Sequence, residues 1–250
     1  AGVKDIEAGA FVSPKWVPQM ADSSNVISAL DLPTTNLTAL TPNLKGAEAA
    51  HAVGIKEFAI FTAASEAFCQ KNINCSIDQS IARFTDVMAF AKSHNIRVRG
   101  YVSCVLGCPY EGDIDPQRVL QVCQKLLDLG CYEVSLGDTI GVGTAKKVDE
   151  LLDVLLAEID KSLLAVHFHD TYGQALTNIY TALKRGIATV ESAVAGLGGC
   201  PYAKGASGNV ATEDVVYLLQ GLGIEHGIDL ERLAKAGWAI CTALNKQPVS

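Results

Sequence analysis

Short β-rich runs and longer amphipathic stretches alternate along almost the whole chain, and this alternation constrains the fold more than any other feature. A parallel strand pair needs a connection about as long as a helix, so repeated strand–helix units predict a parallel sheet with right-handed crossovers. The sequence contains seven such units. We expect strands near Asp5–Ala10, Leu37–Thr41, Glu57–Phe61, Arg97–Ser103, Tyr132–Leu136, Leu164–Phe168 and Thr189–Val194.

Glycine and capping residues mark the ends of the predicted helices. Gly54, Gly130, Gly186 and Gly223 each follow a helical run, and Asp115 precedes a proline suited to the first helical position. We expect helices near Pro18–Leu30, Leu44–Val53, Ile77–His94, Pro116–Leu129, Ala145–Ile159, Ala175–Arg185, Thr212–Leu222 and Leu230–Leu244.

Polar residues gather near the end of almost every predicted strand. They are Glu7, Thr41, Asn43, Ser65, Glu66, Ser103, Asp138, Thr139 and the run from His167 to Asp170. A closed barrel places all of them around one mouth, whereas an open doubly wound sheet concentrates them at one switch point. We therefore expect a (β/α)8 TIM barrel with seven of its eight βα units visible, plus a C-terminal helix. Residues 1–250 would form one catalytic domain that lacks the first unit, because a seven-stranded barrel leaves two unpaired edges.

The composition excludes several classes of protein. Of the 250 residues, 49% are hydrophobic and 19% are charged, which excludes disorder and fits a buried parallel sheet. The net charge of −7 argues against a nucleic-acid partner. No apolar run reaches membrane-spanning length, and the first residues do not resemble a signal peptide. We expect a location in the bacterial cytoplasm or the mitochondrial matrix.

Eight cysteines are present, but their spacing does not predict disulfides. The sequence has no Cys-x-x-Cys pair, and several cysteines fall inside predicted strands or helices. We expect most of them to be small buried residues of a reduced protein, and we do not expect a zinc–thiolate site.

His167 and His169 stand two residues apart at the end of a predicted strand and are followed by Asp170. Residues i and i+2 of a strand point to the same face, so the two imidazoles converge on one place. This arrangement favours metal binding over a structural role. The other histidines, His51, His94 and His226, lie in or beside predicted helices and read as surface residues. The site would accept Mg²⁺, Mn²⁺, Co²⁺ or Zn²⁺.

A glycine-rich segment over residues 196–209 carries one cysteine, Cys200, and ends at Asn209. The Asn209 amide oxygen could complete a metal site, or this residue could be an ordinary helix N-cap or turn asparagine. The Cys200 thiol, held in a loop of high backbone freedom, could act as a general acid. The segment could also bind phosphate, although it lacks the spacing of a P-loop.

Two carboxylates are further candidates. Glu7 ends the first predicted strand, and Asp138 follows the Ser135–Gly137 run. Near a divalent cation each could act as a base or could orient another ligand. Each could equally cap a helix or form a salt bridge at the barrel rim.

These residues resemble the 3-hydroxy-3-methylglutaryl-CoA lyases, which belong to a group of metal-dependent lyase and acyl-transfer TIM barrels. The resemblance covers almost the whole chain, and the last of its motifs, the lyase signature, is the most discriminating. The motifs are Phe11–Met20, Lys71–Ser76, Arg99–Cys104, Gly107–Gly112, Ser135–Gly143, His167–Gly173 and Ala193–Tyr202.

The resemblance implies cleavage of 3-hydroxy-3-methylglutaryl-CoA to acetoacetate and acetyl-CoA, a reaction of leucine degradation and ketone-body formation. It implies an acyl-CoA substrate, a divalent cation (Mg²⁺ or Mn²⁺) and, as an assembly to be tested, a homodimer. His167, His169 and Asn209 would be metal ligands. Cys200 would donate a proton to the acetyl-CoA enolate, and Glu7 and Asp138 would be active-site carboxylates.

The family's first strand ends in an Arg-Asp-Gly motif that supplies a metal ligand and a cation, and this sequence has no such motif near Ala1. We expect the motif to lie before Ala1, so that this chain binds metal weakly until the preceding unit is added. Three alternatives remain: a Claisen-type acyl-CoA/2-oxo acid synthase, an aldolase acting on 4-hydroxy-2-oxo acids, and a non-catalytic acyl-CoA-binding barrel. The Cys200 loop argues against the first two.

Overall fold

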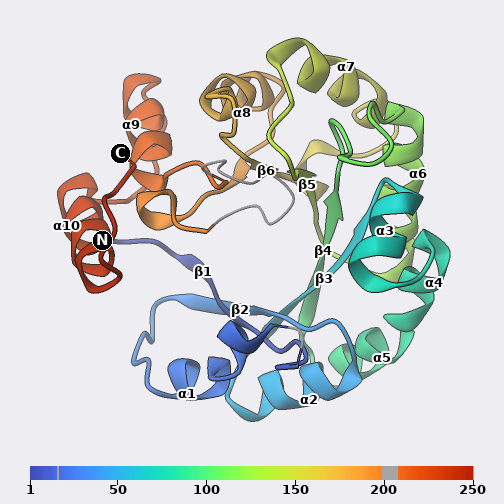
Figure 1. Ribbon diagram of the computed structural model, residues 1–250, viewed down its shortest axis with the longest axis horizontal. Helices are drawn as coiled ribbons and strands as arrows, with labels where there is room; N and C mark the ends of the chain where they lie inside the picture. The colour runs from blue at the N-terminus through green and yellow to red at the C-terminus, as the bar shows by residue number, and fades with distance from the viewer. Residues whose placement is uncertain (16, 199–207, 250) are drawn as a thin grey trace. The chain divides into compact units, whose positions relative to one another are not determined.

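The computed structural model describes residues 1–15, 17–198 and 208–249. Its strands form one seven-stranded sheet in which sequence order and spatial order coincide, from β1 to β7 (Figure 1). The pairs β1–β2, β2–β3 and β6–β7 are parallel, as the strand–helix alternation predicts. The strands are β1 Asp5–Ala10, β2 Asn36–Leu40, β3 Glu57–Ala63, β4 Arg97–Ser103, β5 Val134–Asp138, β6 Leu164–Phe168 and β7 Thr189–Glu191.

Helices follow the strands along the chain. The α-helices are α1 Ser23–Ser28, α2 Leu44–Ala52, α3 Glu66–Ile73, α4 Ile77–Arg83, α5 Thr85–Ser93, α6 Pro116–Leu129, α7 Ala145–Leu155, α8 Ala175–Lys184, α9 Thr212–Gly221 and α10 Leu230–Ala243. Short 3₁₀ turns are η1 Pro18–Met20, η2 Lys161–Leu163 and η3 Val194–Gly196.

Two predicted helices are divided differently in the structure, and one observed helix was not predicted. The predicted helix Ile77–His94 is two helices, α4 and α5, that meet at the buried Phe84. The predicted helix Pro18–Leu30 is a 3₁₀ turn followed by the six-residue α1. The helix α3 was not predicted at all.

Four strands also have other bounds than expected: β2 and β3 differ by one or two residues, and β5 and β7 differ as follows. The fifth strand begins at Val134 and not at Tyr132, and it continues to Asp138. The seventh strand ends at Glu191 and not at Val194, because residues 194–196 turn into η3. The strands β1, β4 and β6 and the helix α6 have the predicted bounds.

The chain divides into two compact units. One unit comprises residues 4–102 and 121–135 and contains β1 to β3 and the helices α1 to α5. Its core includes Phe58 and Ile60 of β3 and Val87 of α5, all fully buried. Successive residues of a strand face opposite ways, so Phe58 and Ile60 point to the same side of the sheet.

Gly9 of β1 is required by close packing within this unit. A Cβ at Gly9 would lie 2.9 Å from the Ser23 hydroxyl, closer than side chains normally approach. The Ser23 hydroxyl donates to the carbonyl oxygens of Ala10 and Met20, so it fastens the start of α1 to β1. The pairing of β1 with β2 shifts register between Glu7 and Gly9.

The other unit comprises residues 1–3, 103–120 and 136–250 and contains β6, β7 and the helices α7 to α10. Leu164 and Val166 of β6 are buried, and so are Leu151 and Leu155 of α7. In the parallel register of β6 and β7, Val166 is the partner of Val190. This unit carries the two histidines that the sequence singles out. Within the described part of the chain, no helix combines the length and the apolar character needed to cross a membrane.

Candidate active site

His167 and His169 converge at the end of β6, as the strand period predicts. Their Nε2 atoms lie 3.2 Å apart, and their rings are tilted by 53° with centroids 5.2 Å apart. Both side chains are half-buried. Two imidazole nitrogens that face each other so closely cannot both carry a proton without repulsion, so the arrangement suits a shared cation.

Glu191 holds His167 in this orientation. The Nδ1 atom of His167 lies 2.7 Å from Oε2 of Glu191, which is its neighbour on β7 in the parallel register. A carboxylate behind a metal-binding histidine keeps Nδ1 protonated and leaves the Nε2 lone pair for the metal. Glu191 was not among the residues predicted from the sequence. In the sequence, Glu191 is only one acidic residue inside a short β-rich run, and this pattern is too common to indicate a role.

His169 stays neutral in the folded protein. Burial, and next the nearby His167, lower the pKa of His169 to about 4. A neutral imidazole is the form that binds metal ions, so no proton has to be displaced near neutral pH.

Asn209 lies beside the histidine pair. Its backbone forms an isolated antiparallel bridge with His169, and its side-chain Nδ2 donates to the Leu197 carbonyl oxygen at 3.0 Å. The N-cap of α9 is Ala211, so the alternative interpretation of Asn209 as an N-cap is wrong. With Nδ2 engaged in this way, Oδ1 is the atom of the amide that could serve as a ligand.

The base of the glycine-rich segment is tightly built. A Cβ at Gly198, whose φ is +102°, would lie 2.6 Å from Nδ2 of Asn209. The buried carboxylate of Glu213 accepts hydrogen bonds from the amide of Ala195, a residue with a positive φ of 53°. Cys200, the predicted proton donor, lies outside the described residues.

Asp138 ends β5 and is fully buried. Its carboxylate accepts hydrogen bonds from the amides of Val142 at 3.2 Å and Gly143 at 2.8 Å, which fixes the loop before α7. Burial raises the pKa of Asp138 to about 6, against the opposing effect of these amides. The next residue, Thr139, provides a backbone contact to His169.

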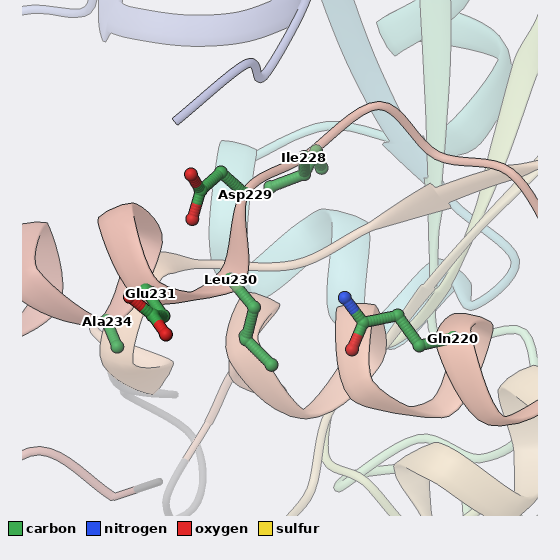
Figure 2. A pocket seen from close by; sticks show the side chains of 6 residues that line it. All are labelled: Gln220, Ile228, Asp229, Leu230, Glu231 and Ala234. Atoms are coloured by element: carbon green, nitrogen blue, oxygen red, sulfur yellow. The ribbon is translucent and has the colours of Figure 1, made fainter.

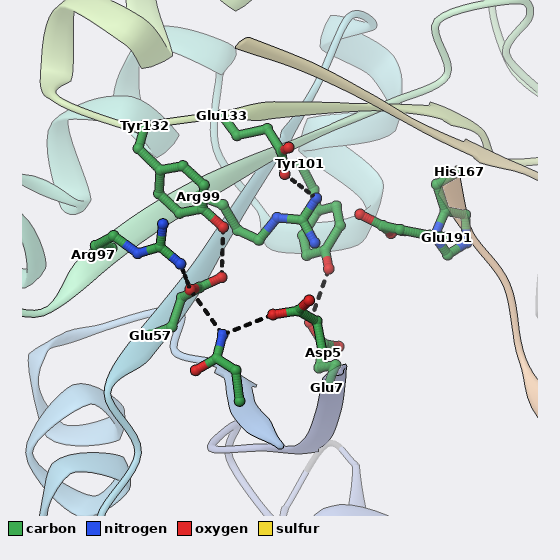
Figure 3. A network of polar contacts seen from close by, with 11 residues as sticks. Asp5, Glu7, Glu57, Arg97, Arg99, Tyr101, Tyr132, Glu133, His167 and Glu191 are labelled. Atoms are coloured by element: carbon green, nitrogen blue, oxygen red, sulfur yellow. Dashed lines mark hydrogen bonds and ion pairs between the residues drawn. The ribbon is translucent and has the colours of Figure 1, made fainter. Parts of the chain in front are cut away.

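Glu7 was expected to end the first strand, but it does not. It is the third residue of β1, and the pairing with β2 continues beyond it to Ala10. Its exposed carboxylate accepts a hydrogen bond of 2.9 Å from the Tyr101 hydroxyl on β4 (Figure 3). Glu7 belongs to the unit of residues 4–102 and 121–135, whereas the two histidines belong to the other unit.

A second polar network occupies the starts of the strands in the unit that contains Glu7. The buried carboxylate of Glu57 accepts hydrogen bonds from Arg97, Tyr132 and Asn36 (Figure 3). Glu57, Arg97 and Asn36 are each the first residue of their strand. Polar groups at the amino ends of parallel strands in such folds serve stability, whereas catalytic groups lie at the carboxyl ends.

A surface pocket of about 660 Å³ lies elsewhere, at the C-terminal helices. Its lining comes from the end of α9 and the start of α10 (Figure 2): Gln220, Ile228, Asp229, Leu230, Glu231 and Ala234. It contains none of the predicted site residues, and one of its two carboxylates, that of Asp229, caps α10 by accepting a hydrogen bond from the amide of Arg232. We therefore assign the candidate site to the histidine pair and not to this pocket.

The donor set around the histidines fits a divalent cation. Two imidazoles converge, one is fixed from behind by a carboxylate, and an amide side chain stands beside them. Among the described residues, no group of three or more His, Cys, Asp or Glu side chains could hold a metal ion. The predicted ligands that lie within the described residues are the two histidines and Asn209.

The family model HMGL-like matches residues 1–240. The chain belongs to the HMGL-like family. Its residues are 59% identical over 247 residues to the 3-hydroxy-3-isohexenylglutaryl-CoA/hydroxy-methylglutaryl-CoA lyase of Pseudomonas aeruginosa, covering 98% of this chain and 82% of the relative. They are 58% identical over 248 residues to the mitochondrial hydroxymethylglutaryl-CoA lyase of Bos taurus, covering 99% of this chain and 76% of the relative.

A solved structure of an HMGL-like relative agrees closely with the fold. The crystal structure of hydroxymethylglutaryl-CoA lyase from Pseudomonas aeruginosa matches with a TM-score of 0.97 and 58% identity, covering 100% of this chain and 84% of the other. The fold of this HMGL-like protein is therefore of the TIM-barrel type, as the polar residues at the strand ends predict.

Proposed function

We propose that this protein cleaves 3-hydroxy-3-methylglutaryl-CoA to acetoacetate and acetyl-CoA. The observation that carries the proposal is the pair His167–His169, with Nε2 atoms 3.2 Å apart and Glu191 behind it. The high identity to two lyases over nearly the whole chain supports the same reaction. A synthase or an aldolase of the same barrel group has no comparable support.

The reaction breaks one carbon–carbon bond. A base removes the proton of the tertiary hydroxyl, and the C–O bond becomes the C=O bond of the acetoacetate ketone. The carbon–carbon bond breaks, and its electron pair forms the acetyl-CoA enolate. An acid then protonates the enolate carbon. A divalent cation would polarise the substrate oxygens and stabilise negative charge on them.

We assign roles to the chain's own residues on this basis. His167, His169 and Asn209 would hold the cation, Mg²⁺ or Mn²⁺, and Glu191 would keep the lone pair of His167 directed at it. Cys200 would protonate the enolate. Glu7 would act as an active-site carboxylate that the Tyr101 hydroxyl orients.

Asp138 has a different kind of contact from Glu7. Both of its carboxylate oxygens accept hydrogen bonds from backbone amides of the β5–α7 loop. We therefore propose that Asp138 acts on the site by shaping this loop and through the adjacent Thr139, which contacts His169.

We also propose the complete barrel of eight βα units for this protein, as one catalytic domain. The sheet order places β1 and β7 at the two edges, where an eighth strand would pair with both. The eighth unit would bring the Arg-Asp-Gly motif of the family. The bacterial and mitochondrial relatives suggest the bacterial cytoplasm or the mitochondrial matrix as the location.

The test is release of acetyl-CoA from 3-hydroxy-3-methylglutaryl-CoA, with and without Mg²⁺ or Mn²⁺. The assay uses this chain, the chain extended by the corresponding N-terminal segment of the Pseudomonas aeruginosa relative, and the Cys200→Ala variant of each. We expect metal-dependent release that is stronger in the extended chain and is lost in the variant. No release from either chain with any metal would overturn the proposed function.

A further inference from the structure

His51 and His94 form a second histidine pair, on the outer side of the unit of residues 4–102 and 121–135. His51 lies in α2 and His94 follows the last residue of α5, and the two helices pack side by side (Figure 1). The ring centroids are 4.6 Å apart and the rings are tilted by 56°. Both side chains are exposed, so an ion from solution can reach them.

The ring of His94 is fixed by the end of α5. Its Nδ1 atom lies 2.9 Å from the carbonyl oxygen of Phe90 and 2.9 Å from the Ser93 hydroxyl. A carbonyl oxygen only accepts, so the contact with Phe90 requires a proton on Nδ1 and leaves the lone pair on Nε2. A backbone carbonyl behind a histidine serves metal binding in the same way as a carboxylate does.

The ring of Phe90 packs against the rings of both histidines. Its centroid lies 4.2 Å from that of His94 and 5.7 Å from that of His51. Phe90 itself stacks on the buried Phe58 with an interplanar angle of 16°. The two imidazoles therefore rest on a rigid aromatic base, which limits the rearrangement that binding would require.

The ring separation allows the two imidazoles to share one metal ion. With metal–nitrogen distances of about 2.0–2.1 Å, two imidazoles at a ligand angle of roughly 90–110° have centroids ~4.5–5.2 Å apart. The separation of 4.6 Å between His51 and His94 falls in this range, as does the separation of 5.2 Å between His167 and His169. The tilts of the two pairs, 56° and 53°, are also alike.

We propose that His51 and His94 form a second metal site, separate from the candidate active site, for a divalent transition-metal ion such as Ni²⁺, Cu²⁺ or Zn²⁺. Imidazole nitrogens suit these ions, whereas Mg²⁺ prefers oxygen ligands and keeps its waters. Water fills the remaining coordination positions at this exposed pair. The proposal does not depend on the reaction that the protein catalyses.

The test is calorimetric titration of the whole chain with Ni²⁺, and with Mg²⁺ for comparison. The variants are His51→Phe and His94→Phe, which keep an aromatic ring against Phe90 but cannot bind an ion. We expect each of them to weaken one Ni²⁺ site by at least about 10-fold, since even the loss of a group behind a ligand has effects of this size. Mg²⁺ should give no heat that depends on either residue.

Two controls separate this site from others. His226→Phe changes a histidine outside both pairs and should leave the titration unchanged. His167→Ala removes the candidate active-site pair and should leave the His51–His94 site intact. Circular dichroism verifies that each variant is folded. Ni²⁺ binding within twofold of wild type in either His51→Phe or His94→Phe would overturn the proposal.

Discussion

At the scale of single residues, the candidate site depends on the groups behind the histidines as much as on the histidines themselves. The strand period predicts that His167 and His169 share a face, and their Nε2 atoms do lie 3.2 Å apart. Glu191 could not be predicted in the same way. It comes from another strand, and only the parallel register of β6 and β7 places it beside His167.

Replacing Glu191 with glutamine should weaken metal binding. Glutamine keeps the shape of the side chain but loses the charge that fixes the Nδ1 proton of His167. We expect affinity for Mn²⁺ to fall by about 10- to 100-fold. Titration of the variant with Mn²⁺ measures the change, and the exposed Glu158→Gln is the matched control. Equal affinity in wild type and Glu191→Gln would refute the role of this carboxylate.

Asp138 should make stability depend on pH in mildly acidic solution. In the unfolded chain an aspartate titrates near about 3.9, whereas burial raises the pKa of Asp138 in the folded state to about 6. Between these pH values the folded state binds more protons, so the contribution of Asp138 to the free energy of unfolding falls as pH rises. That contribution is greatest below the unfolded pKa and is lost as pH passes the folded pKa.

The Asp138→Asn variant removes this titration. From pH 4 to pH 7 we expect the free energy of unfolding of wild type to decline relative to the variant, by at most about 3 kcal/mol, given about 1.4 kcal/mol per pKa unit. Urea denaturation at four pH values measures this difference. A constant difference across the range would show that Asp138 does not titrate there.

At the scale of elements, the sequence predicts the existence of strands and long helices better than their ends. α6 has the predicted bounds because Asp115 and Pro116 mark its start and Gly130 follows its end. The division of residues 77–94 into α4 and α5 has no such local signal, because Phe84, the residue at which the two helices meet, fits a helix interior as well. α3 was missed although Ser65 accepts a hydrogen bond as its N-cap.

Replacement by alanine should have opposite effects on stability at Gly100 and Gly221. A Cβ at Gly100 in β4 would lie 2.8 Å from a methyl group of Leu126, whereas at Gly221 in α9 nothing lies within 4 Å. We expect Gly100→Ala to destabilise the protein by about 1–3 kcal/mol through overpacking. Gly221→Ala should stabilise it by about 0.4–1 kcal/mol. Urea denaturation of both variants measures the change in the free energy of unfolding. A change of the same sign in both would contradict this packing.

At the scale of the whole molecule, a cation bound at the candidate site should raise the free energy of unfolding. The site joins β6, β7 and the bridge between His169 and Asn209, so an ion that binds only the folded state opposes the separation of these elements. The sequence predicts the barrel class from the strand–helix alternation. It does not predict the pairing of Asn209 with His169, which depends on how the glycine-rich segment returns to the sheet.

We expect Mn²⁺ at about 100 times its dissociation constant to raise the free energy of unfolding by about 2.7 kcal/mol. Thermal unfolding with increasing Mn²⁺ measures the effect as a rising midpoint. The His167→Ala variant should show a much smaller rise. An equal rise in this variant would place the stabilising ion elsewhere in the molecule.

The buried cysteines can be used to measure where the folded protein opens. The seven described cysteines are all buried, and they are distributed over both units: Cys69, Cys75, Cys104, Cys108, Cys123, Cys131 and Cys241. Burial raises the pKa of Cys123 and Cys131 to about 12, which suppresses the reactive thiolate. An alkylating reagent can reach such a thiol only when the surrounding structure opens. The labelling rate of each cysteine therefore measures the opening of its own neighbourhood.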